Sequence, residues 1–145
     1  MVPPIREILL PTDLSEHSKL AMRYANSLAE RFGAQITVLH VIEPPAVPPD
    51  VFYPCTRAPD QLATAAERTI KRICEQEKLE WPQLKKCVVQ PGVPYEVIVD
   101  AAKAQNTDLI VLATHGRTGL AHVVMGSTTE KVIQHAPCPI LVLRV

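Results

Sequence analysis

Two short stretches of the chain combine residue types that could bind a phosphorylated ligand. The first contains Gly116, Gly119 and Gly126-Ser127. Glycines let another group approach the backbone closely. The second is Pro11-Thr12-Asp13, whose carboxylate can accept hydrogen bonds from an adenine amino group or a ribose hydroxyl. Together they predict a site with an anion-binding end and a carboxylate-bearing end.

A helix is expected to begin directly after the glycine-bearing loop. Ser127 is a suitable N-cap, and Glu130 three residues later completes a capping box, so the helix would start near Thr128. Free N–H groups at a helix N-terminus bind phosphate readily. The pattern is neither a P-loop, which needs a lysine before the Ser or Thr, nor a Rossmann fingerprint. The alternative is that the glycines and the serine serve only the structure of the loop.

Apolar runs supply the strands that would position these loops. Residues 109–113 form an uninterrupted apolar run, as in a parallel strand covered on both faces. A first strand is expected over 5–10, stopped by Pro11, and a second over 35–42. The helix between them would be capped by Ser15 or Asp13 and ended by Gly33. Its near-helical repeat consists of Leu20, Tyr24, Leu28 and Phe32, with Ala21, Ala25 and Ala29 beside them.

The rest of the chain continues the alternation of strands and helices. An amphipathic helix is expected over residues 60–78, a strand over 85–90, a helix over 94–105 and a last strand over 140–145. The segment 43–59 is too rich in proline for a helix or a sheet interior and is expected to be a loop. It is either a lid or partner surface, or a plain surface excursion. The alternation predicts an α/β fold with a parallel sheet and helices on both faces.

An open parallel sheet binds ligands beyond the carboxyl ends of its strands, where the strand order reverses. If the first and fourth strands flank that point, Pro11-Thr12-Asp13 faces residues 113–116 across the crevice. Asp13 would then contact the ligand. The alternative for Asp13 is an ordinary helix cap, and the two roles are compatible.

Length and charge narrow the class of protein. A chain of 145 residues is expected to form one domain over 1–145, and its 15 basic residues balance 15 acidic ones. We therefore expect no attraction to nucleic acid or to an anionic membrane. No apolar segment approaches the roughly 18 residues that span a bilayer and no signal peptide is recognised, so a cytoplasmic location is expected.

The sequence contains four cysteines without C-x-x-C spacing: Cys55, Cys74, Cys87 and Cys138. They are expected to be core or surface thiols, and the alternative is a redox role.

With these residues placed, the whole chain resembles the small, single-domain universal stress proteins. The likeness is carried by four motifs: Leu10-Pro-Thr-Asp-Leu-Ser15, Leu39-His-Val41, Thr114-His-Gly-Arg-Thr-Gly119 through Gly126-Ser127, and His135-Ala-Pro-Cys-Pro-Ile-Leu-Val142. The resemblance implies a three-layer α/β sandwich of the adenine nucleotide alpha hydrolase-like type. Its five-stranded parallel sheet would have the order 3-2-1-4-5.

The resemblance also implies a glycine pattern that marks the ATP-binding branch of the family. The pattern is a glycine, two residues, a second glycine, nine residues, and a glycine followed by Ser or Thr. Here Gly116 is the second glycine and Gly126-Ser127 closes the pattern, but Ala113 replaces the first glycine. The added methyl group puts the affinity for ATP in question.

By the same resemblance, Asp13 and the backbone of Val41 would hold adenine, with Pro11 and Thr12 lining that end. The ribose would lie along Leu112 and Ala113. The phosphates would be held by His115, Gly116, Gly126, Ser127, Thr128 and Thr129. Arg117 and a divalent cation such as Mg²⁺ are candidates for further phosphate contacts. Members of the family usually dimerise through the last strand, which implies a homodimer through Ile140–Val145, an apolar edge here.

Three functions follow as hypotheses. The leading one is an ATP-binding, dimeric stress-response sensor or regulator with weak or no hydrolysis. The second is a nucleotide-free dimeric interaction protein with the same fold, favoured by Ala113. The third is a true enzyme, such as a slow ATPase, a phosphotransferase or a thiol-dependent redox protein. No catalytic residue is assigned, because His115, the candidate base, is expected to contact phosphate only.

Overall fold

The computed structural model describes residues 1–44, 59–80, 82–114 and 126–144. Strands and helices alternate along these residues, as the hydrophobic pattern predicts. In chain order the elements are β1 (Glu7–Pro11), α1 (Glu16–Phe32), β2 (Gln35–Ile42), α2 (Pro59–Gln76), β3 (Leu84–Pro91), α3 (Pro94–Ala104), β4 (Leu109–Ala113), α4 (Ser127–His135) and β5 (Ile140–Leu143).

The strands form one five-stranded sheet in the order β3-β2-β1-β4-β5. Each neighbouring pair is parallel. The predicted fold class and strand order are therefore confirmed. The order reverses between β1 and β4, so the carboxyl ends of these two strands flank the point where open α/β sheets bind ligands.

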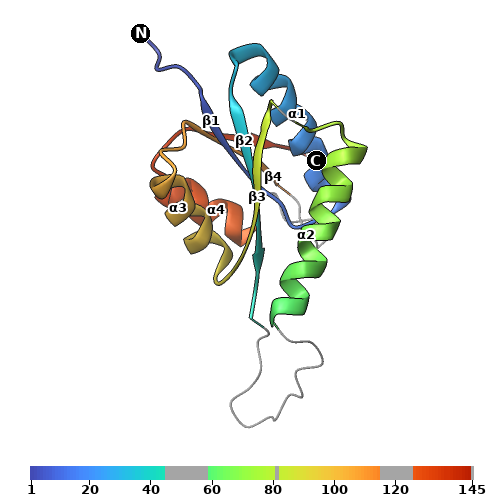
Figure 1. Cartoon of the computed structure of the whole chain (residues 1–145). Coiled ribbons are helices and arrows are strands. Elements are labelled where there is room, and N and C mark those ends of the chain that lie inside the picture. The colour runs from blue at the N-terminus through green and yellow to red at the C-terminus, as the bar shows by residue number, and fades with distance from the viewer. Residues whose placement is uncertain (45–58, 81, 115–125, 145) are drawn as a thin grey trace.

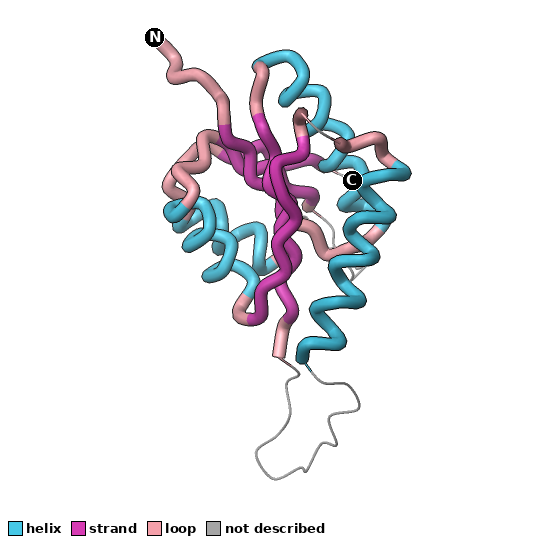
Figure 2. The backbone as a smooth tube through the Cα atoms, viewed as in Figure 1, coloured by secondary structure: helices cyan, strands magenta, loops and turns pink. Residues whose placement is uncertain are grey.

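Helices cover both faces of the sheet, so the molecule has three layers (Figures 1 and 2). Helices α1 and α2 lie on one face, where Met22, Ile70 and Ile73 pack against the strand residues Val38 and Val111. On the other face α3 and α4 bury a second cluster, formed by Leu9, Leu39, Ile98, Ala102, Ile110, Leu112 and Val132. Because β1 and β4 are covered on both sides, they read as continuous apolar runs instead of alternating ones.

The amino ends of β1 and β4 are joined by one carboxylate. Asp108, directly before β4, accepts hydrogen bonds at Oδ2 from the backbone N–H groups of Arg6 (2.8 Å) and Glu7 (2.9 Å). The Asp108 N–H in turn donates to the Glu7 carbonyl at 2.8 Å. This clamp holds the two central strands together at the edge opposite the one where ligands bind.

Helix α1 begins and ends as the sequence predicts. Ser15 is the N-cap and its side chain accepts from the Ser18 N–H, while Gly33 ends the helix with φ 66°. The buried face is made by Ala21, Met22, Ala25 and Ala29, whereas Tyr24 and Phe32 are 50% and 56% exposed. Small side chains let α1 approach the sheet closely, and the larger residues beside them are left on the rim.

The start of α4 corrects one prediction. The helix begins at Ser127, with Gly126 as the N-cap in an extended conformation and without a side-chain capping bond. The Glu130 N–H donates to the Gly126 carbonyl at 3.1 Å. The predicted capping box of Ser127 and Glu130 is therefore wrong. Because Ser127 already has helical backbone angles as the first helical residue, its side chain is out of the N-cap position.

Several boundaries differ by one or more residues from those expected. Helix α2 begins at Pro59, whose fixed φ suits a first helical turn, so this proline belongs to the helix and not to the loop. The proposed lid or partner surface within 43–59 falls mainly on residues 45–58, which lie outside the described part of the chain. No helix among the described residues is both long enough and apolar enough to span a membrane.

Candidate functional site

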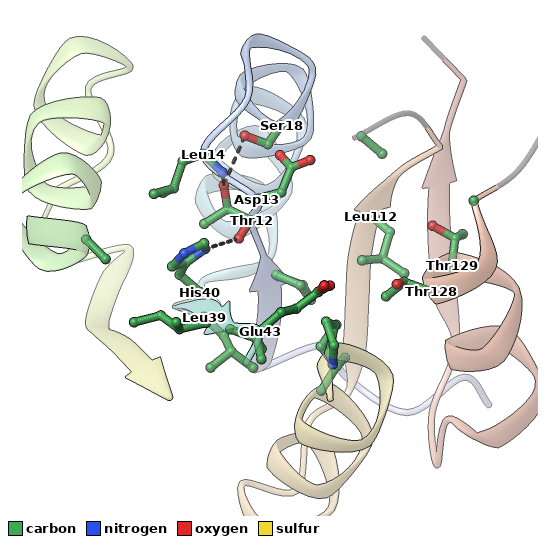
Figure 3. A pocket seen from close by; sticks show the side chains of 18 of the residues that line it. Thr12, Asp13, Leu14, Ser18, Leu39, His40, Glu43, Leu112, Thr128 and Thr129 are labelled. Carbon is green, nitrogen blue, oxygen red and sulfur yellow. Dashed lines mark hydrogen bonds between the residues drawn. The ribbon is translucent and has the colours of Figure 1, made fainter. Parts of the chain in front are cut away.

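A cavity of about 680 Å³ opens beyond the carboxyl ends of β1, β2 and β4. It lies at the point where the strand order reverses. Strand ends, the start of α1, one side of α2 and the start of α4 all contribute to its wall. Figure 3 shows Thr12, Asp13 and Leu14 on one side of it and Leu112, Thr128 and Thr129 on the other.

Thr12 is the most firmly held residue of the wall on the β1 side. Its N–H donates to the Leu39 carbonyl at 2.8 Å, and its carbonyl lies 2.8 Å from His40 Nδ1. Its hydroxyl donates to Ser18 Oγ at 2.9 Å and accepts from the Leu14 N–H at 3.1 Å. Thr12 is 8% exposed, so these bonds are made in a place that water does not readily reach. The loop after β1 is therefore pre-formed.

Asp13 follows in the same loop and lines the cavity. Its Oδ1 accepts from the Ser15 N–H at 3.0 Å, which leaves the capping of α1 to Ser15. The next residue, Leu14, has φ 66°, a left-handed conformation that costs a non-glycine residue roughly 1–2 kcal/mol. Strain of this kind persists only where neighbouring contacts enforce it. The bond from Leu14 to Thr12 is one of those contacts.

The β2 side of the cavity contains His40 and Val41. His40 is 8% exposed and its Nδ1 donates to the Thr12 carbonyl. With that proton on Nδ1, the neutral ring has Nε2 as an acceptor. His40 lies in one of the motifs quoted above, but strand periodicity marks it only as a residue on the covered face. Its contact with Thr12 depends on the pairing of β1 with β2, which the local pattern does not specify.

Helix α2 supplies a mostly apolar wall that the sequence did not predict as part of the site. Leu62, Ala65, Ala66 and Thr69 of this helix line the cavity. They follow helical spacing and read from the sequence as ordinary core positions. Apolar walls with a few polar groups are typical of small-molecule sites, and such a wall suits a flat ring system.

The amino end of α4 forms the opposite, polar side. Gly126, Ser127, Thr128 and Thr129 line the cavity there, and the first N–H groups of a helix have no intrahelical acceptor. The positive end of the helix dipole adds to the attraction of this end for an anion. Gly126 has φ −68°, and a Cβ placed on it would meet only the Thr114 carbonyl at 3.7 Å. The fold therefore does not require a glycine at this position.

The predicted site residues are largely brought together. Ten of them line the cavity: Pro11, Thr12, Asp13, Val41, Leu112, Ala113, Gly126, Ser127, Thr128 and Thr129. His115, Gly116 and Arg117 lie outside the described residues. Ser18, His40 and Thr69 also line the cavity and were not predicted. The described residues contain no cluster of three or more His, Cys, Asp or Glu side chains that could hold a metal ion.

Comparison with known proteins assigns the family. The model described as "Universal stress protein family" matches residues 4–144, so the chain belongs to the universal stress protein family. Universal stress protein MJ0531 of Methanocaldococcus jannaschii is 32% identical over 143 residues, which cover 96% of this chain and 82% of the relative. A universal stress protein of Thermus aquaticus is 34% identical over 139 residues, covering 96% and 98%.

Solved structures share the fold. Hypothetical protein MJ0577, a universal stress protein of Methanocaldococcus jannaschii, superposes with a TM-score of 0.80 at 25% identity, covering 99% of this chain and 98% of its own. Two more distant structures are complexes with adenine nucleotides. One is a universal stress protein with cAMP (TM-score 0.69, 18% identity, covering 97% and 98%). The other, from Archaeoglobus fulgidus, holds dAMP (TM-score 0.64, 19% identity, covering 98% and 98%).

Proposed function

We propose that this protein binds an adenine nucleotide, with ATP as the leading candidate, and that it acts in the cytoplasm as a dimeric stress-response sensor or regulator. The observation that carries the proposal is the shape of the cavity: a carboxylate on a rigid loop at one side and a helix N-terminus at the other. A nucleotide has the matching chemistry, with hydrogen-bond donors on the base and sugar and an anion at its far end. The cAMP and dAMP complexes of two structural neighbours support the choice of adenine.

The residues of the wall have distinct roles in this proposal. Asp13 and the backbone of Val41 hold the adenine end, with Pro11 and Thr12 beside them, and Leu112 and Ala113 lie along the ribose. The apolar side of α2 covers the base. The N–H groups at the start of α4 and the hydroxyls of its first turn hold the phosphates, with Mg²⁺ as the companion cation: Gly126, Ser127, Thr128 and Thr129. We assign further phosphate contacts to His115 and Gly116, which lie outside the described residues.

Slow or absent hydrolysis is part of the proposal. The titratable side chains among the described residues of the cavity are Asp13, His40 and Glu43. His40 binds the Thr12 carbonyl and Asp13 binds the Ser15 amide, so both serve to hold the loop. A general base must reach the attacking water near the terminal phosphate, and we assign His40 and Asp13 to the opposite end of the ligand. Glu43 borders Ser127 and Thr128 at the proposed phosphate end, so among the described residues of the cavity it is the carboxylate available to support slow hydrolysis.

Calorimetric titration of ATP with Mg²⁺, and of AMP, tests the proposal. Binding should be micromolar in the parent and weaker by about tenfold or more in Asp13→Ala, because a lost hydrogen bond to a charged group is worth roughly 1.5–3 kcal/mol. Asp100→Ala, which removes an exposed carboxylate from α3, should bind like the parent. No binding by the parent, or equal binding by both aspartate variants, would contradict the proposal.

Gly126 provides a second, independent variant for this titration. Gly126→Ala should fold like the parent, because the new methyl group would lie at van der Waals distance from the Thr114 carbonyl and the backbone of Gly126 is not left-handed. It should nevertheless weaken nucleotide binding by about tenfold, because close approach of the backbone to the phosphate is lost. Gly126→Arg should abolish binding. Unchanged affinity in both variants would place the phosphates elsewhere.

A nucleotide-free interaction protein is the second candidate, and the observation that favours it is Ala113. Its methyl group lines the cavity and packs against the core on the α1 side. If that methyl group blocks the nucleotide, ATP will not raise the melting temperature of the parent, whereas Ala113→Gly will gain a ligand-dependent shift. If the parent already shows the shift, this second candidate is wrong.

A further inference from the structure

Two cysteines from different elements meet between α2 and β3. Cys74 lies on the face of α2 that packs on the sheet and is 3% exposed. Cys87 lies in β3, the outer strand of the sheet, and is half-buried. Both belong to or pack against the same apolar cluster. The helix and the strand are thus held together around a pair of thiols that the proposed nucleotide site does not use.

The side chains of Cys74 and Cys87 interact where α2 packs on β3. The interaction with Cys74 lowers the pKa of Cys87, and the positive charge of Lys71 acts in the same direction, against the effect of burial. The interaction with Cys87 raises the pKa of Cys74, with burial and the charge of Glu75 adding to the effect. Cys87 is therefore the more nucleophilic and the more accessible of the two, and Cys74 is in place as its partner.

We propose that Cys74 and Cys87 are an oxidant-responsive dithiol, which a hydroperoxide converts into an intramolecular disulfide joining α2 to β3. The thiols come from positions only 13 apart in sequence but from two separate elements, so the bond would fix the helix against the outer strand. The proposal is independent of nucleotide binding.

The reaction takes two steps and consumes one peroxide. The Cys87 thiolate attacks one peroxide oxygen, the O–O bond breaks, and the leaving oxygen takes up a proton, which gives Cys87 sulfenic acid and water when the oxidant is hydrogen peroxide. The Cys74 sulfur then attacks the Cys87 sulfur, the S–O bond breaks, and the departing hydroxyl leaves as water with the Cys74 proton. Two electrons pass from the sulfur pair to the peroxide, and two waters are formed in all.

The bond would act on a helix that also lines the cavity. Thr69, on the cavity wall, precedes Cys74 by five residues, or roughly 7.5 Å along the axis of α2. The disulfide therefore restrains the same helix that covers one side of the cavity. Oxidation would restrict the movement of this wall, and it would modify no residue to which we assign a ligand contact.

Peptide mapping of the full chain tests the proposal. Reduced protein is treated with hydrogen peroxide, its remaining thiols are alkylated, and tryptic peptides are identified by mass. Trypsin cuts after Lys78 and Lys86, so the cross-link would join peptides 73–78 and 87–103. We expect this cross-linked pair, with the loss of two alkylatable thiols per chain and their recovery with dithiothreitol. Free Cys74 and Cys87 at a dose that oxidises Cys55 or Cys138 would overturn the proposal.

Two variants separate this pair from the other thiols. A protein with both Cys55→Ser and Cys138→Ser should still lose two thiols and stay free of disulfide-linked dimers. Adding Cys74→Ser should leave Cys87 as a sulfenic acid that dimedone traps, because its partner is missing. Disulfide-linked dimers, or sulfinic acid at Cys87 while Cys74 is present and free, would also overturn the proposal. If the variants fold poorly, the peptide map of the parent protein still shows whether the disulfide between Cys74 and Cys87 forms.

Discussion

The single residue on which the candidate site most depends is Thr12, because its backbone and hydroxyl make four hydrogen bonds in a buried place. These bonds hold the loop that carries Asp13 and force Leu14 into a left-handed conformation. The surrounding hydrogen bonds offset the free-energy cost of that conformation. The carboxylate is thus positioned before a ligand arrives.

Removal of the Ser18 hydroxyl tests this role at the scale of one residue. Ser18→Ala should lower the free energy of unfolding by roughly 1–3 kcal/mol, because it leaves the buried hydroxyl of Thr12 without its acceptor. Urea denaturation measures the change. The matched control is Ser27→Ala, an exposed serine on the same helix, which should be neutral or slightly stabilising because alanine favours helix. Equal effects of the two changes would contradict the role assigned to Ser18.

Residue-scale predictions from sequence succeeded where the chemistry is local. The capping of α1 by Ser15 and its end at Gly33 depend on side chains close to one another in the chain, and both are confirmed. The capping box of Ser127 was wrong because Gly126, which has no capping side chain, occupies the cap. His40 was missed because its partner, Thr12, lies in the loop that follows another strand, β1.

At the scale of elements, the turn between β3 and α3 requires a glycine. Gly92 has φ 145°, and a Cβ added to it would come within 2.7 Å of Val97 Cγ2. Its N–H donates to the Ile42 carbonyl at 3.1 Å, so the turn is also joined to β2. This turn places Pro94, at the start of α3, on the wall of the cavity.

Gly92→Ala should therefore destabilise the protein more than Gly33→Ala does. At Gly33 the φ of 66° is left-handed, which costs an alanine roughly 1–2 kcal/mol, and an added Cβ meets no atom within 4 Å. At Gly92 the φ of 145° lies in a region that is essentially restricted to glycine, and the contact with Val97 adds to that strain. The difference in urea midpoint between the two variants therefore measures the larger backbone strain and the contact with Val97 together. The added change Val97→Ala should recover part of the loss in Gly92→Ala. If the two glycine variants are equally stable, the close contact is not rigid.

One ion pair links the middle of α1 to the residue just beyond the end of α2. Arg23 binds Glu77 through two hydrogen bonds, from Nε to Oε2 and from Nη2 to Oε1 at 3.1 Å. The bond from Arg23 lowers the pKa of Glu77, and the positive charges of Arg23 and Lys19 add to this against a smaller opposing effect of burial. A carboxyl with a lowered pKa in the folded state contributes stability above its ordinary pKa, and this contribution is lost as the pH falls through the folded value.

The stability difference between the parent and Arg23→Gln should accordingly be largest near neutral pH. It should shrink as the pH falls below the usual glutamate value of 4.5 and approach zero in stronger acid. Thermal melts in low salt from neutral to acidic pH measure it, and Arg31→Gln, an exposed arginine in the last turn of α1, serves as the control. A difference that does not change with pH would mean that Arg23 acts by packing its aliphatic stem.

Element existence and order along the chain were predicted well, and element edges less well. Long periodic segments such as α2 carry a strong signal, because helical spacing repeats over several turns. The ends of β1, β3 and β5 differ from the expected ones by one to two residues. Strand ends depend on the register with neighbours, and local sequence contains no information about those neighbours.

At the scale of the whole molecule, the outer strand β5 is the feature with consequences for assembly. Its four residues pair on one side with β4, and β5 ends the sheet in the described chain. Leu141 and Ile140 pack on opposite cores. An apolar outer strand with unpaired backbone groups favours pairing with a second copy, and we propose that the homodimer forms there.

Val142→Lys should prevent that pairing. The residue is half-buried within β5, and a lysine on an edge strand disfavours strand addition. Light scattering coupled to gel filtration should give a dimer for the parent and a monomer for the variant. Gln90→Lys, which places a lysine at an exposed position of the opposite outer strand β3, should leave the dimer intact. A monomeric parent, or dissociation in the β3 variant, would rule out the β5 interface.

The strand order illustrates what local patterns omit. Alternation of strands and helices predicts a parallel sheet, but many orders satisfy it. The order 3-2-1-4-5 came from the family resemblance, and the pairing of β1 with both β2 and β4 confirms it. The contribution of α2 to the cavity was not predicted from the sequence, since it requires knowing that this helix covers the same face as α1.

The Asp108 clamp gives the two central strands a fixed end and a free end. Since Arg6 and Glu7 are bound to Asp108 at the amino edge and β1 pairs with β4 at Ile8 and Leu9, a displacement of β1 relative to β4 on ligand binding would be smallest at that edge and largest at the opposite one. A fluorophore near Arg6 should then report only global unfolding, whereas one near Ser127 should respond to occupancy of the cavity. Two labels on one molecule would separate the two signals.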